Sequence, residues 1–230
     1  MPACCSAIRH VSARLPRQRS RHSLGELMVT VRPGDGTIKR RRGALRIWCG
    51  DHPKRETQET YTMYLYLIRH AQPHYNAPVP YHVPPGPGLT EHGLAQAAAL
   101  VPMLRQVGIE RLVSSPLRRC TMTAEPLAAA LNMDLHIDDD LREQQPGEAA
   151  ADVNVRMLRA ALAQSDVRVV ALFSHAAPLT ELLRTLTHNE IVLPPKDYRG
   201  NHLLECMVWG LHNRGGRWKA QHLPPNGRAC

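Results

Sequence analysis

Two short apolar runs in this chain each end on a histidine. Residues 64–70 read Tyr-Leu-Tyr-Leu-Ile-Arg-His, and residues 169–175 read Val-Val-Ala-Leu-Phe-Ser-His. Apolar runs of this length predict buried strands, and an open α/β sheet binds its ligands at the carboxyl ends of such strands. We therefore expect His70 and His175 to converge on one pocket.

Helical and strand patterns alternate along the same part of the chain. We expect strands at about 64–68, 111–114, 134–137 and 167–173, and helices at about 91–106, 117–131, 149–164 and 177–187. Residues 203–211 and 217–223, around an Asn-Arg-Gly-Gly turn, predict a β-hairpin. The alternation predicts a largely parallel sheet with helices on both faces.

Four segments, in this order, resemble the motifs of the histidine phosphatase superfamily, the phosphoglycerate mutase-like enzymes. They are Arg-His-Ala at 69–71, Leu-Thr-Glu-His-Gly at 89–93, Ser-Ser-Pro-Leu-Arg-Arg at 114–119 and Ser-His-Ala at 174–176. The resemblance runs from Met63 to the C-terminus. It implies a three-layer α/β/α sandwich of mostly parallel strands with an antiparallel edge, and phosphate-ester chemistry through a phosphohistidine.

The chemistry of these residues agrees with the resemblance. A phosphate monoester is a compact dianion, and Arg69 and Arg119 carry planar guanidinium groups that can each grip two phosphoryl oxygens. His70 is the candidate nucleophile, because a neutral imidazole attacks phosphorus without a separate base. The resemblance adds His175 and Asn76 as donors to the phosphoryl group. Since two guanidiniums neutralise the phosphate, we expect no metal or other cofactor.

The leaving alkoxide needs a proton, so a carboxylic acid should lie at the pocket rim. The resemblance gives this role to Glu143, but the sequence that follows departs from the family's Trp-Glu-Gly-like element, and Glu148 and Asp140 remain alternatives. Ala71 and Ala176 replace the glycines that commonly follow the two histidines. If those positions need a positive φ, the added methyl groups would weaken phosphate binding.

A metal pair and a serine nucleophile fit the same residues less well. His70 and His74 are separated by a proline-containing loop and have no clear third ligand, which is not a zinc motif. Ser114 and Ser115 lack the Gly-x-Ser-x-Gly elbow of serine hydrolases. A function of another class stays open, a catalytically weak module that binds phosphate or polyanions.

The N-terminal quarter differs from the rest in charge. Residues 1–62 carry 13 Lys and Arg against 5 Asp and Glu, a net charge of +8, whereas residues 63–230 carry 16 against 15. Basic clusters without an apolar period predict a disordered extension before a histidine phosphatase domain at 63–230. The extension resembles a transit peptide, could bind nucleic acid or an anionic membrane surface by charge, or precedes the true start at Met63; we favour the last.

The six cysteines form no CxxC pair, which fits a reduced, cytoplasmic setting. No apolar run reaches the roughly 18 residues of a spanning helix, so we expect no membrane partner, and nucleic acid only through residues 1–62.

The spacing of two site residues bears on the reaction. Glu143 and His175 are 32 positions apart, whereas mutases of the superfamily typically carry a long insertion there. A short connection predicts an open pocket that admits water, and hence a phosphatase acting on a small phosphorylated metabolite. A phosphoglycerate mutase-like phosphotransferase and a phosphohistidine-protein phosphatase are the alternatives. The oligomeric state does not follow from the sequence.

Overall fold

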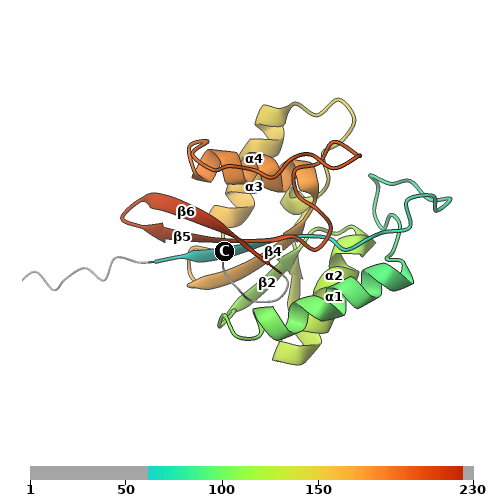
Figure 1. Cartoon of the computed structure of the whole chain (residues 1–230), viewed down its shortest axis with the longest axis horizontal. Helices are drawn as coiled ribbons and strands as arrows, with labels where there is room; N and C mark the ends of the chain where they lie inside the picture. Colours follow the sequence, from blue (N-terminus) through green and yellow to red (C-terminus); the bar gives the residue numbers. More distant parts are fainter. Residues whose placement is uncertain (1–61, 225–230) are drawn as a thin grey trace, which may run out of the picture. The chain divides into compact units, whose positions relative to one another are not determined.

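The computed structural model describes residues 62–224. Residues 1–61 and 225–230 lie outside this range, so the disordered extension and the domain boundary stay predictions. The described part folds into a six-stranded mixed sheet with two α-helices on each face, which confirms the expected α/β/α sandwich with an antiparallel edge (Figure 1). None of the helices within 62–224 is long and apolar enough to cross a membrane.

The sheet has the strand order β3-β2-β4-β1-β5-β6. Its strands are β1 (Tyr64–Arg69), β2 (Arg111–Ser114), β3 (Leu135–Ile137), β4 (Val169–Ser174), β5 (Val208–Arg214) and β6 (Arg217–Leu223). The first four are parallel, and β5 and β6 form an antiparallel hairpin beside β1. In the β1–β4 pair Arg69 lies opposite Ser174, so the two strands end at the same level.

The helices form two layers, α1 and α2 on one face of the sheet and α3 and α4 on the other (Figure 1). They are α1 (Glu91–Leu104), α2 (Arg118–Leu131), α3 (Ala150–Leu162) and α4 (Ala176–Leu186), with a short 3₁₀ turn at Asp139–Leu141. Successive side chains of a strand point to opposite faces, so Leu65 and Leu67 pack in the core under α3 and α4, while Ile68 packs under α1 and α2. This burial holds the site-bearing end of β1 between two cores.

The Leu-Thr-Glu-His-Gly motif fastens α1 to the chain that follows β1. Thr90 caps α1 by accepting a hydrogen bond from the Gly93 amide at 3.0 Å, and its own amide donates to the Gln72 carbonyl at 3.0 Å. A Cβ on Gly93 would lie 2.2 Å from that same carbonyl oxygen. Position 93 therefore needs glycine for close backbone approach.

The prediction for the first strand of the hairpin is wrong at the N-terminal end of that strand. Strand β5 begins at Val208 and not at residue 203, because the Met207 amide donates to the Leu204 carbonyl and Cys206 adopts a left-handed φ of 56°. The chain thus turns once more before it enters the sheet. The glycines of the Asn-Arg-Gly-Gly turn have positive φ, as a tight hairpin requires.

Candidate active site

The two strand-end histidines and the two arginines meet at the carboxyl edge of the parallel strands. Arg69 ends β1 and His70 follows it, His175 is the N-cap residue of α4, and Arg119 lies in the first turn of α2. All four are buried, and the imidazole centroids are 5.2 Å apart. The structure thus brings the two histidines side by side, as expected.

The backbone fixes which nitrogen of His70 can react. Its Nδ1 lies 2.8 Å from the Ala71 carbonyl oxygen, which can only accept, so Nδ1 carries the proton and Nε2 keeps a lone pair. Burial, reinforced by the charges of Arg119 and Arg69, lowers the pKa of His70 well below its usual 6.5. His70 is thus a neutral imidazole near neutral pH.

His175 is held from both sides of its ring. Its Nε2 lies 2.9 Å from the Ser115 hydroxyl and its Nδ1 3.4 Å from the Glu143 carboxylate. The Ser115 hydroxyl also accepts from the Leu117 amide at 3.3 Å, so its hydrogen bond to Nε2 fixes the orientation of the His175 ring. The buried Cys120 thiol lies 3.5 Å from Nε2, and burial raises its pKa to about 12, so it stays neutral.

Both arginines are anchored at one nitrogen and leave others without a partner. Arg69 donates from Nη1 to the Leu203 carbonyl and lies 3.7 Å from Asp197, while Arg119 donates from Nη1 to the Tyr81 carbonyl at 2.9 Å. Within residues 62–224, the Nε atoms of both arginines and Nη2 of Arg119 have no hydrogen-bond partner. These buried donors suit an anion with several oxygens.

The structure separates the three candidate acids. Burial raises the pKa of Glu143, although Arg119 at 3.6 Å opposes the shift. Glu148 is bound by Arg156 and Asp140 by Arg159, and these hydrogen bonds lower the pKa of each carboxyl. Neither lines the cavity, whereas Glu143 does. A carboxyl that retains its proton suits a general acid, so Glu143 fits the role best.

Asn76 lies outside the cluster. It is exposed in the loop after β1 and does not line the cavity, although its neighbour Tyr75 does. Neither Ala71 nor Ala176 has a positive φ, so neither alanine occupies a backbone conformation that favours glycine. The Ala71 amide donates to the Thr123 hydroxyl, and Ala176 lines the cavity.

A cavity of about 580 Å³ adjoins the cluster: Arg69 and Glu143 line it, whereas His70, His175 and Arg119 are not among its lining residues. Several residues that line this cavity were not predicted from the sequence as site residues: Tyr75, Tyr81, His82, Gln144, Gln145, Arg199 and Asn201. They come from loops without hydrophobic periodicity, which offer no signal in a single sequence. Ser115 lies within the Ser-Ser-Pro motif, so that motif could have pointed to it.

His70, Glu143 and His175 could also hold a metal ion, since one ligand atom from each lies within 4.8 Å of the others. Two histidines and a glutamate are a known ligand set for catalytic zinc. The positive charges of Arg69 and Arg119 in the same cluster oppose a cation and favour an anion. The charges therefore favour phosphate over a metal at this point.

The sequence matches the family model of the histidine phosphatase superfamily (branch 1) over residues 65–153, which include His70, Arg119 and Glu143. A bifunctional protein of Mycobacterium tuberculosis is 42% identical over 84 residues, 36% of this chain and 23% of that protein. A probable phosphoglycerate mutase of Escherichia fergusonii is 34% identical over 83 residues, 36% of this chain and 39% of that protein. The matched segment thus spans well under half of these curated relatives.

Solved structures share the fold over more of the chain. A mycobacterial glucosyl-3-phosphoglycerate phosphatase is similar with a TM-score of 0.54 and 22% identity, over 70% of this chain and 98% of that one. The alpha-ribazole phosphatase from Shigella flexneri has a TM-score of 0.56 and 18% identity, over 70% and 95%. Both are similar in fold. The family model and the motifs gathered at one edge of the sheet lead to one conclusion: residues 65–153 are a segment of the histidine phosphatase superfamily, branch 1.

Proposed function

We propose that this chain is a metal-independent phosphomonoester hydrolase that works through a phosphohistidine on His70. The observation that carries the proposal is the pairing of an unprotonated His70 Nε2 with two buried guanidiniums, of which both Nε atoms and Nη2 of Arg119 have no hydrogen-bond partner among the described residues. Such a site binds a dianion and presents a nucleophile to it. The similar solved structures are phosphatases and one relative is a probable phosphoglycerate mutase, which supports phosphoryl chemistry of this class.

In the first step, Arg69 and Arg119 hold the phosphoryl oxygens while His70 Nε2 attacks phosphorus in line. The N–P bond forms as the bond to the leaving oxygen breaks, and that oxygen takes the proton of Glu143. His175, whose Nδ1 lies near Glu143, donates to an equatorial oxygen where charge develops. The products are the free alcohol, a phosphohistidine and a Glu143 carboxylate.

In the second step, the Glu143 carboxylate takes a proton from a water molecule as that water attacks phosphorus. The N–P bond breaks, Nε2 of His70 regains its lone pair, and inorganic phosphate leaves. Glu143 ends protonated, ready for the next cycle. One residue acts as acid and then as base, which its raised pKa allows.

Hydrolysis is favoured over mutase chemistry by the access of water to the pocket. Only α3 and β4 separate Glu143 from His175, so no long insertion covers the cavity there. A small phosphorylated metabolite is the substrate class that fits a cavity of about 580 Å³.

The test is hydrolysis of p-nitrophenyl phosphate by the full chain in EDTA, beside H70A. We expect turnover that EDTA does not reduce and that H70A abolishes. Turnover lost in EDTA and restored by zinc would instead assign His70, Glu143 and His175 to a metal. A folded protein that binds phosphate and turns over no phosphoester would be a binding module. Phosphoryl transfer between phosphoglycerates that outpaces hydrolysis would make the chain a mutase.

A further inference from the structure

A stack of two tyrosine rings between two arginine side chains runs from the proposed phosphate site along the cavity. The Arg119 guanidinium carbon lies 4.1 Å from the Tyr81 ring centre, Tyr81 stacks on Tyr75 at 6.1 Å with planes 13° apart, and the Arg199 guanidinium carbon lies 3.4 Å from the Tyr75 ring centre. Two guanidiniums are therefore separated by two stacked rings. The inner one belongs to the proposed phosphate site, and the outer one has no role there.

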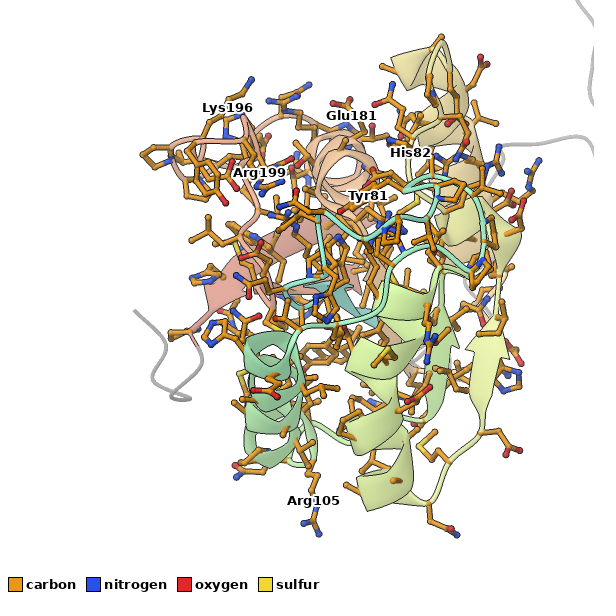
Figure 2. All side chains as sticks on the ribbon, turned by 90° about the vertical axis from the view of Figure 1, so that its right-hand side faces the viewer. Tyr81, His82, Arg105, Glu181, Lys196 and Arg199 are labelled. Carbon is orange, nitrogen blue, oxygen red and sulfur yellow. The ribbon has the colours of Figure 1, made fainter. Side chains whose placement is uncertain are left out.

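Arg199 is fixed at this place although it is exposed. Its guanidinium donates to the Tyr198 hydroxyl, and its backbone amide donates to the Asp197 carboxylate, which also accepts from the Asn201 amide. The same Asp197 lies 3.7 Å from Arg69, so the loop that carries Arg199 is tied to the phosphate site. Figure 2 shows Arg199 and Tyr81 on the side that faces the viewer, from two different loops.

The charge of Arg199 is not neutralised by a carboxylate. Within residues 62–224 it forms no ion pair, because Asp197 is paired with Arg69 and the nearby Glu205 accepts from the Tyr75 hydroxyl. Glu205 also lines a different pocket. A planar cation held on an aromatic face inside a cavity can bind an anionic group with both of its arms.

We propose that Arg199, seated on Tyr75, is a second anion subsite, and that the substrate is a phosphomonoester whose organic part carries a second anionic group at its far end. This inference rests on the proposed hydrolase function. Contacts of 4.1, 6.1 and 3.4 Å along the stack separate the two guanidinium carbons, so the two anionic groups lie at opposite ends of a moiety of about sugar size. Tyr75 and Tyr81 form the wall along which that moiety lies.

The test compares two matched substrate pairs at constant ionic strength. The pair 6-phosphogluconate and glucitol 6-phosphate tests whether the site recognises a carboxylate at the far end of the substrate. The pair fructose 1,6-bisphosphate and fructose 6-phosphate tests whether it recognises a second phosphate. We expect the wild-type chain to prefer the doubly anionic member of at least one pair by roughly 10-fold in kcat/KM. R199Q should abolish that preference through KM while leaving the singly anionic esters within about 2-fold, and R199K should keep part of it.

R105Q is the control for loss of one positive charge, since Arg105 ends α1 away from the cavity (Figure 2). It should change no preference. A wild type without preference in either pair, or an R199Q that slows both members of a pair equally, would overturn the subsite.

Binding separates this inference from the hydrolase proposal. Calorimetry on H70A, which cannot form the phosphohistidine, should show that the doubly anionic ester of the preferred pair binds more tightly than its mate, and that adding R199Q removes the difference. If the wild type hydrolyses none of the four esters but this binding difference is present, the hydrolase has failed and the subsite stands. If turnover occurs without any binding difference, the subsite has failed and the hydrolase stands.

Discussion

The phosphate end and the rim of the cavity are built in different ways. At the phosphate end, His70 and Arg119 are buried and are placed by a strand end and a helix start. At the rim, Tyr75 and Arg199 come from loops, and Arg199 is exposed. Under the proposed function, the difference means that the sheet positions the reacting groups while the loops select the substrate, a division expected where a rigid scaffold carries binding loops.

The largest effect is expected from removing the nucleophile at the phosphate end. H70A should lower kcat by about 10⁴-fold or more, because the covalent route is lost and only binding and electrostatics remain. Stopped assays with p-nitrophenyl phosphate measure the loss. H74A is the matched control, since His74 is exposed on the following loop, and it should retain full activity. Equal losses of activity in H70A and H74A would contradict the role of His70 as the nucleophile.

The next effect concerns the general acid. In the proposed mechanism the free enzyme is active when His70 is neutral and Glu143 is protonated. Because the pKa of His70 is lowered, kcat/KM should fall on the acid side only well below pH 6.5. Because the pKa of Glu143 is raised, kcat/KM should fall on the alkaline side above pH 4.5. E143Q should reduce kcat/KM by about 10²- to 10³-fold and remove the alkaline limb. D140N, at a carboxyl already paired with Arg159, should leave the whole profile unchanged. An alkaline limb that survives in E143Q would assign the acid elsewhere.

A smaller effect tests the backbone contact between Gly93, at the start of α1, and Gln72, in the chain after β1. G93A should destabilise the fold by about 2 kcal/mol, because the new methyl group would press on the Gln72 carbonyl and shift the start of α1. Urea unfolding measures the change. At Gly210 an added Cβ meets only ordinary contacts, so G210A should change the free energy of unfolding by less than about 0.5 kcal/mol. Equal stability of the two variants would mean that α1 is not seated by this contact.

The smallest effect sharpens the role of Ser115, a positioning residue behind His175. S115A should reduce kcat about 10-fold with little change in KM, because the hydroxyl that orients the His175 ring is lost. S115T keeps a hydroxyl and should restore most of the rate. A purely structural role would instead lower the thermal midpoint in S115A and would show no rescue by threonine.

Most of the fold and of the phosphate end could be predicted from the sequence, for a physical reason. The apolar runs that end at Arg69 and Ser174 are strands buried on both faces, and chemistry at their carboxyl ends follows from parallel pairing. The start of β5 could not be predicted, because a non-glycine residue, Cys206, takes a left-handed conformation there. Arg199 could not be predicted either, because its place on Tyr75 depends on two loops that meet only in three dimensions.

The roles of the site residues remain predictions that one measurement tests most directly. The full chain is mixed with p-nitrophenyl phosphate in EDTA, quenched within the first turnovers under alkaline conditions, digested and examined by mass spectrometry. The account predicts an acid-labile phosphoryl group on His70 that forms and decays at rates matching turnover, and that is absent in H70A. Turnover without any phosphoryl group on His70, or with one on another residue, would contradict it.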